Sequence, residues 1–189
     1  MAPLFERIKS FDTSFLEASD GLVTMFDLFG SRVFGFVQSD IKSNIGGVRA
    51  YYENHQNSSK TLEDLVRSEA GSHPKHGTAC LIRLIRGLAL TQHALKHMQD
   101  HPSDELHVCF KNAYDVVLRH HHAWVVRGVV NVSMSSHPRR PTSTRFLSLY
   151  LSGEPAERFD PELGKWLKAL GDIVTRIKDF LEGGGHGKV

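Results

Sequence analysis

Two pairs of polar side chains stand in apolar surroundings at spacings that place each pair on one side of a helix. Asp40 and Asn44 are four residues apart, and Arg83 and Arg86 are three apart in CLIRLIRGLAL. A carboxylate and an amide beside aliphatic residues suit a ligand with a polar head and an apolar body, although a solvated surface pair is the ordinary alternative. A guanidinium in an apolar run needs a carboxylate or a ligand anion, and it matches phosphate oxygens. The arginines therefore indicate either an internal salt bridge, for example to Asp40, or a phosphate site.

Histidine is the third candidate for chemistry, because the chain has 12 histidines. Residues 120–122 are three in a row; on a regular helix they point about 100° apart and cannot all bind one metal ion. His93, His97 and His101 are better spaced, but no carboxylate like the glutamate of a zinc-protease helix accompanies them. A histidine of the triplet that donates a hydrogen bond in the core is the simpler interpretation. Without a phosphate-binding glycine loop, a nucleophile elbow or paired cysteines, we expect no metal, no cofactor and no enzyme.

Apolar residues recur at helical spacing along the chain, and no useful alternating pattern is found, which predicts an all-α fold. The Asp–Asn pair lies in a helix predicted over 33–52, in which Gly46 and Gly47 would allow another helix to approach closely. The arginines lie in a helix predicted over 76–100, and the histidine triplet in one predicted from 104 to about 135. Further helices are predicted over 15–29, over 62–66 with Thr61 as N-cap, and over 161–181 with Asp160 as N-cap and Pro161 at the first position.

Composition and charge bound the class of protein. A chain of 189 residues with 40% hydrophobic and 23% charged residues is typical of one globular domain, which we expect over 1–189 with residues 1–10 and 183–189 at its periphery. The formal net charge of +2 is too small to favour nucleic acid and permits mild attraction to an anionic membrane. No run is apolar enough for a signal peptide or a membrane span, and two cysteines do not suggest a disulfide framework. We expect a cytoplasmic protein.

Four motifs in order resemble the glycolipid transfer protein family over residues 22–151: MFDLFGSRVF, DIKSN, RLIRGL, and HAW before a long apolar helix. The resemblance implies a two-layer helical sandwich that encloses a hydrophobic lipid pocket, and non-vesicular transfer of sphingolipids between membranes. It implies that Asp40 binds the head group and the ceramide amide, and that His122 bonds the ceramide carbonyl. It also implies membrane contact by Trp124, for which core packing is the alternative. The family places pocket-lining apolar residues at Phe34, Val37, Leu90, Leu118 and Val130.

The resemblance leaves two classes of head group open. Sugar-binding members carry a tryptophan, a stacking platform, where this chain has Arg83, and a lysine where it has Gly47. Carriers of ceramide-1-phosphate favour basic residues, as at Arg83 and Arg86, but tend to have lysine where this chain keeps Asn44. Loss of the tryptophan removes the main apolar contact to a sugar face, so ceramide-1-phosphate-like cargo is narrowly favoured. A glycolipid-selective carrier and a sphingolipid sensor are alternatives, and a phosphoester hydrolase with His122 as general base is a remote one.

The carrier interpretation implies few partners. We expect a sphingolipid ligand, transient peripheral contact of a monomer with membranes, and no nucleic acid. Burial of hydrocarbon contributes about 0.8 kcal/mol per methylene, so a sixteen-carbon chain represents roughly 13 kcal/mol and does not cross water unaided at a useful rate. An apolar protein pocket makes the exchange nearly neutral, so selectivity must come from the polar site.

Overall fold

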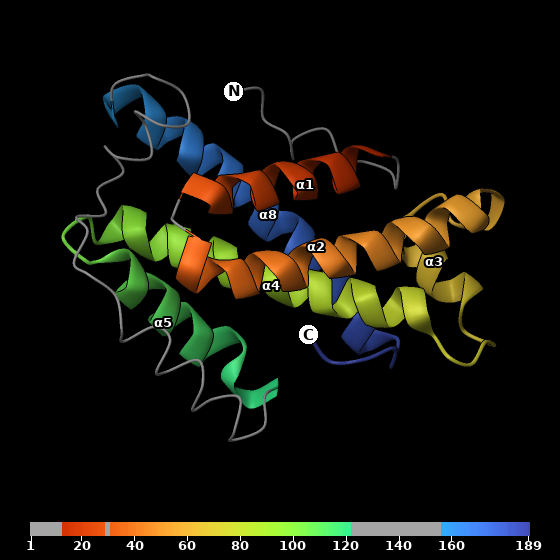
Figure 1. Cartoon of the computed structure of the whole chain (residues 1–189). Coiled ribbons are helices and arrows are strands. Elements are labelled where there is room, and N and C mark those ends of the chain that lie inside the picture. The colour runs from red at the N-terminus through yellow and green to blue at the C-terminus, as the bar shows by residue number, and fades with distance from the viewer. Residues whose placement is uncertain (1–12, 29–30, 122–155) are drawn as a thin grey trace.

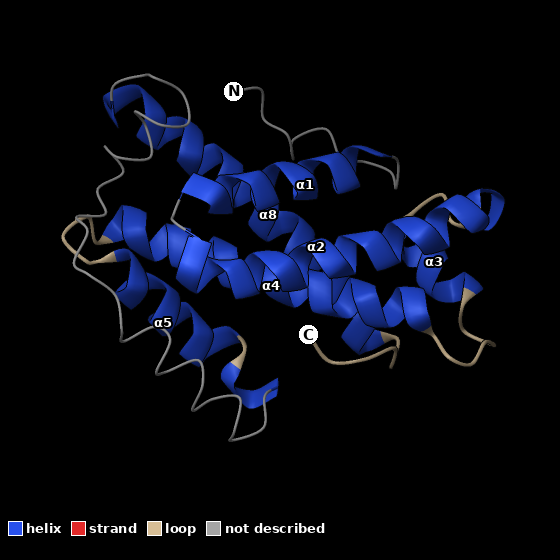
Figure 2. Cartoon of the chain, viewed as in Figure 1, coloured by secondary structure: helices blue, strands red, loops and turns tan. Residues whose placement is uncertain are grey.

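The computed structural model describes residues 13–28, 31–121 and 156–189, and every regular element in these ranges is a helix, which confirms the predicted all-α class (Figure 2). No helix within these ranges is long and apolar enough to cross a membrane. The elements are α1 (Thr13–Leu28), α2 (Ser31–Asn54), the 3₁₀ turn η1 (Gln56–Ser58), α3 (Leu62–Ser68), α4 (His76–Asp100), α5 (Leu106–Val117), the 3₁₀ turn η2 (Arg119–His121) and α8 (Ala156–Gly183).

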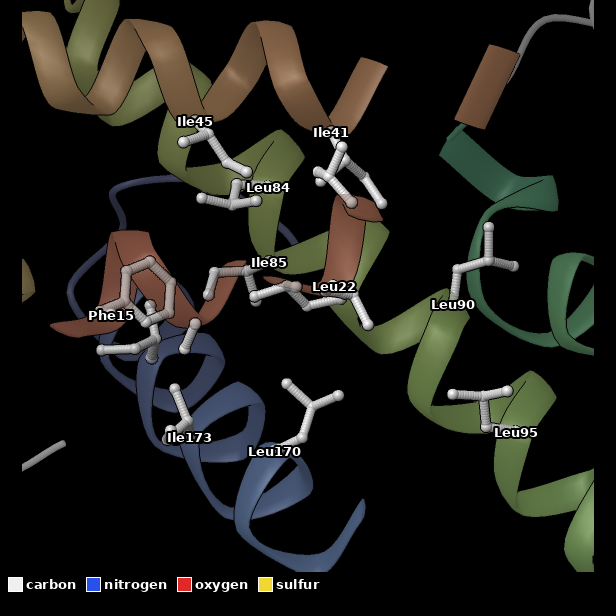
Figure 3. Close-up of a cluster of buried hydrophobic side chains, with 14 of the residues drawn as sticks. Phe15, Leu22, Ile41, Ile45, Leu84, Ile85, Leu90, Leu95, Leu170 and Ile173 are labelled. Atoms are coloured by element: carbon white, nitrogen blue, oxygen red, sulfur yellow. The ribbon is translucent and has the colours of Figure 1, made fainter. Parts of the chain in front are cut away.

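Helix α4 lies in the middle of the described structure, where α2, α3, α5 and α8 all contact it, and α1 covers α2 (Figure 1). Its central position follows from its sequence, because buried side chains occur all around it rather than along one stripe. The side chains of all six α-helices in the described ranges meet in one apolar cluster, part of which is drawn in Figure 3. The cluster includes Phe15 and Leu22 of α1, Ile41 and Ile45 of α2, Leu84 and Ile85 of α4, and Leu170 and Ile173 of α8.

Three glycines bring the backbones of α2 and α4 close together, and we call this contact the glycine seam. A Cβ atom at Gly47 would lie 2.3 Å from Cys80 Sγ, which confirms the predicted close approach, whereas a Cβ at Gly46 would meet nothing within 4 Å. The two helices run antiparallel, because residues further along α2 meet residues earlier in α4. The seam contacts are Gly47 with Cys80, Gly87 with Ile41, and Gly77 with Tyr51.

A buried carboxylate holds the first turn of α4. Glu69 is 2% exposed, and its two carboxylate oxygens accept hydrogen bonds from the backbone N–H of Gly77 at 2.8 Å and of Thr78 at 2.6 Å. These N–H groups have no partner within the helix, and a negative charge at a helix N-terminus is favourable. Glu69 therefore fixes where α4 begins relative to the end of α3.

The predicted helix bounds are confirmed in some places and wrong in others. Thr61 caps α3 as predicted, since its Oγ1 accepts from the N–H of Asp64 at 3.0 Å. The single helix predicted from 104 to about 135 is wrong at 118–121, because α5 ends at Val117 and η2 follows, and residues 122–135 lie outside the described residues. Consecutive histidines have low helix propensity, which favours this break. Helix α8 begins at Ala156 and includes Pro161, so the predicted start at Pro161 is also wrong. The proline removes only one hydrogen bond near the N-terminal end of a long helix.

Candidate functional site

Asp40 and Asn44 lie on successive turns of α2 but differ in exposure. Asp40 is exposed, whereas Asn44 is only 4% exposed and its Nδ2 donates to the backbone carbonyl of Asp40 at 2.8 Å. Ile41 and Ile45, which follow them in sequence, are 1% exposed, so the polar pair lies at the border of the core. The carboxylate of Asp40 is therefore the group of this pair that a ligand can reach directly.

Arg83 is an exposed cation on α4. It forms no hydrogen bond and no ion pair with any residue in the described ranges. Within the same ranges neither Arg83 nor Arg86 pairs with Asp40, so the internal salt bridge considered from the sequence is not found there. An exposed guanidinium without a partner is available to an anion.

Arg86 differs from Arg83 because the end of the chain covers it. Residues 184–189 turn back after α8 through Gly185, whose φ of +68° is in the left-handed region that favours glycine. The carbonyl of Lys188 then accepts a hydrogen bond from Arg86 Nη2, while Arg86 Nε is buried without a partner. Burial of the guanidinium lowers the pKa of Arg86, and the neighbouring charge of Arg83 lowers it further. Arg86 is thus half-buried and engaged by the returning chain.

The charges of Asp40 and Arg83 both act on the thiol of Cys80, which lies in the glycine seam. Burial raises the pKa of Cys80, the charge of Arg83 lowers it, and the charges of Glu69 and Asp40 raise it. Both Asp40 on α2 and Arg83 on α4 are therefore close enough to act on the same sulfur atom. Sequence periodicity did not reveal Cys80 as the contact of Gly47, although a glycine opposite a small residue is a usual sign of close helix packing.

The structure describes the side chains of only some of the other residues that the resemblance assigns to the lipid site. The side chains of Val37, Leu90 and Leu118 are buried or partly buried, and Val37 and Leu118 pack against the core that includes Leu90. Phe34 lies in α2, but its side chain is not among those described, and three further assigned residues lie outside the described residues: His122, Trp124 and Val130. The roles of all seven stay predictions.

His97, one of the three histidines spaced along α4, has a partner that helical spacing could not predict. His97 Nε2 lies 2.8 Å from a carboxylate oxygen of Asp104, which the turn before α5 brings back to α4, and the His97 ring lies 4.4 Å from that of His101. In the part of the chain that the structure describes, no group of three or more histidine, cysteine, aspartate or glutamate side chains is arranged to hold a metal ion.

Comparison with known proteins agrees with this arrangement. The family described as "Glycolipid transfer protein (GLTP)" matches residues 12–149. A glycolipid transfer protein of Aureobasidium melanogenum is 36% identical over 169 residues, which cover 89% of this chain and 82% of that protein. Among solved structures, the fungal glycolipid transfer protein HET-C2 has a TM-score of 0.77 at 33% identity and covers 90% of this chain and 84% of its own.

The same fold occurs in a protein that is named for a different lipid head group. The human ceramide-1-phosphate transfer protein, solved in complex with 12:0 ceramide-1-phosphate, has a TM-score of 0.77 at 21% identity and covers 91% of this chain and 86% of its own. At that identity the likeness concerns the fold alone. The family consists of lipid transfer proteins rather than enzymes. From the match over most of its length and the identity to the fungal relatives, the chain belongs to the glycolipid transfer protein family.

Proposed function

We propose that this protein transfers sphingolipids between membranes and holds the polar head of the lipid beside the glycine seam. Membership of the family supports a lipid carrier. The observation that carries the site is that the charge of the exposed, unpartnered Arg83 on α4 and the charge of the exposed Asp40 on α2 both act on the thiol of Cys80. Asp40 would accept the ceramide amide N–H, and Arg83 would donate to the head group.

We further propose a phosphate-bearing head group, such as that of ceramide-1-phosphate. A guanidinium matches phosphate oxygens and replaces the tryptophan that sugar-binding members use for stacking. The lysine of those members has no equivalent, because Gly47 packs against Cys80 with no room for a Cβ atom. Asn44, which favours a sugar, is nearly buried and uses an amide N–H on the backbone of Asp40. All three features support phosphate over sugar.

A glycolipid head group is the second candidate. Both the Aureobasidium melanogenum relative and HET-C2 are named glycolipid transfer proteins, and Asn44 keeps the residue type of the sugar binders. A sphingolipid sensor would use the same site but would bind its lipid tightly and transfer it slowly.

We assign Arg86 a supporting role at this site. Its guanidinium lies next to Arg83 and bonds the carbonyl of Lys188, so it holds the returning chain beside the head-group position. The proposal also includes a cytoplasmic monomer that contacts membranes transiently through Trp124, and a hydrogen bond from His122 to the ceramide carbonyl.

The experiment that tests the cargo compares vesicle-to-vesicle transfer of ceramide-1-phosphate and galactosylceramide. Hydrogen bonds to charged groups contribute about 1.5–3 kcal/mol, so Arg83→Leu should slow ceramide-1-phosphate transfer roughly 10- to 150-fold and galactosylceramide transfer much less. Arg67→Leu, which removes another exposed arginine from α3, is the control and should leave both rates unchanged. Equal losses for the two lipids after Arg83→Leu would overturn the phosphate assignment.

A second variant tests the site itself. Asp40→Val should abolish transfer of both lipids, because it removes the acceptor for the ceramide amide that both share, while circular dichroism should show unchanged helicity. Because Asp40 is exposed, its replacement should not unfold the protein. Normal transfer by a folded Asp40→Val variant would contradict the head-group site.

A further inference from the structure

A groove of about 500 Å³ is lined by residues of α4, α5 and α8, and its α4 residues belong to the C-terminal half of that helix, at least six positions after Arg83. Each helix contributes a small residue to the lining: Ala89 from α4, Ala113 from α5 and Gly171 from α8. A Cβ atom at Gly171 would lie 3.3 Å from Gln92 Nε2, so a larger residue there would project into the groove. The volume is within the range of small-molecule sites.

The charges around this groove compensate one another. Lys96 forms a salt bridge with Asp100, and His97 lies 2.8 Å from the carboxylate of Asp104. Burial lowers the pKa of His93, and the charge of Lys178 lowers it further, so the His93 imidazole is neutral near pH 7. A phosphate, a carboxylate or a metal ion would therefore find no free counter-charge among the lining residues.

Neutral polar groups, in contrast, are free. The side chains of Gln92, His93, Asn112 and Thr175 line the groove and form no hydrogen bond within the described part of the chain. Two amides, a hydroxyl and a neutral imidazole present both donors and acceptors. Together with the apolar residues of the lining, such as Ala89, Ala113 and Val174, they suit a ligand that alternates hydroxyl groups with C–H faces.

We propose that this groove binds a neutral, polyhydroxylated ligand of the size of a monosaccharide or disaccharide. The ligand is either a free saccharide or a sugar carried on a membrane lipid, since both present the same hydroxyl groups. This site is separate from the Asp40–Arg83 site, and it stands independently of the cargo proposed for that site.

Saturation-transfer NMR with the full chain tests the groove, with maltose and glucose as probes. Both sugars should receive saturation. In the Arg83→Leu background, which removes the phosphate site proposed above, glucose-6-phosphate should receive less than glucose. Asn112→Leu and Thr175→Val remove one polar group each from exposed positions without a large change of size, and each should weaken maltose binding about tenfold. Asn54→Leu, at the exposed end of α2, is the matched control and should bind maltose as the unchanged protein does.

The head-group site must be excluded as the source of the signal. Maltose should still bind when Asp40→Val is introduced, and the loss caused by Asn112→Leu should persist in that background. Absence of saturation transfer to every sugar, or maltose binding that survives both groove variants, would overturn the proposal.

Vesicles distinguish the two sources of the sugar. Sedimentation with phosphatidylcholine vesicles that contain galactosylceramide should exceed that with plain vesicles, and Asn112→Leu should remove the excess, if the groove takes a membrane-borne sugar. If the ligand is a free saccharide, maltose binding should depend on the groove, but sedimentation should be the same with both kinds of vesicle.

Discussion

Replacement of Gly47 by alanine tests how closely α2 and α4 approach beside the proposed head-group site. The added Cβ atom would lie 2.3 Å from Cys80 Sγ and 3.0 Å from Cys80 Cβ, far inside ordinary contact distances. Cys80 is 4% exposed, so its sulfur has little space into which to move. The two helices must then separate, or Cys80 must leave its rotamer.

Two opposing effects set the size of the change. Alanine is favoured over glycine inside a helix by about 0.5–1 kcal/mol. Overpacking of a well-packed core costs about 1–3 kcal/mol, and a heavy-atom contact this short belongs to the upper part of that range. We therefore expect Gly47→Ala to lower the free energy of unfolding by about 1–2 kcal/mol, which corresponds to roughly 2–8 °C in Tm for a chain of this size.

Urea unfolding of four proteins measures the coupling free energy between residues 47 and 80. The proteins are the unchanged chain, Gly47→Ala, Cys80→Ala and the double variant. Cys80→Ala removes the sulfur that the new methyl group meets, so the double variant should be about 1–2 kcal/mol more stable than the sum of the single changes predicts. Gly46→Ala is the matched control, because its Cβ meets nothing within 4 Å, and it should be neutral or slightly stabilising. Additivity of the two changes, or equal stability of Gly46→Ala and Gly47→Ala, would refute the reasoning.

Two further variants test buried groups at the end of α3 and on α5. Glu69→Ala leaves the N–H groups of Gly77 and Thr78 without their charged acceptor and should lower the free energy of unfolding by about 3–5 kcal/mol, whereas the exposed Glu53→Ala should change it by less than about 0.5 kcal/mol. Equal changes in the free energy of unfolding for the two variants, measured in urea, would show that the Glu69 carboxylate does not stabilise the start of α4. Burial raises the pKa of Cys109 from 9.0 to about 11, so the folded protein holds this proton more tightly than the unfolded chain. The stability that Cys109 confers over Cys109→Ala should be constant below pH 9 and fall by about 2 kcal/mol towards pH 11, and a constant difference would exclude the raised pKa.

Local features of the chain could be predicted from sequence because local physics decides them. Helix α4 begins at His76 and ends at Asp100 as periodicity predicts, and Thr61 caps α3 as its residue type predicts. The break after α5 is equally local, since it depends on the poor helix propensity of consecutive histidines, but the apolar periodicity beyond them concealed it. The start of α8 was concealed by Pro161, which a helix accepts close to its N-terminal end.

Contacts between distant segments could not be predicted in the same way. The carbonyl of Lys188 bonds Arg86 from 102 positions along the chain, and no spacing rule connects them. The bonds from Gly77 and Thr78 to Glu69 span only eight and nine positions, but they cross the loop between α3 and α4, which helical spacing does not describe. Spacing placed Asp40 and Arg83 each on one face of its own helix, but only the packing of α2 against α4 decides that the two charges act on one thiol.

The glycine seam has a consequence for how the two ends of a lipid would be recognised. The seam fixes how far apart the backbones of α2 and α4 lie, and the exposed side chains of Asp40 and Arg83 extend from these two backbones. Adjustment to lipid chains of different length must then occur elsewhere in the fold. Under the proposed function, the free energies of head-group binding and chain burial become additive, so the preference between two head groups should not vary with the number of carbons attached.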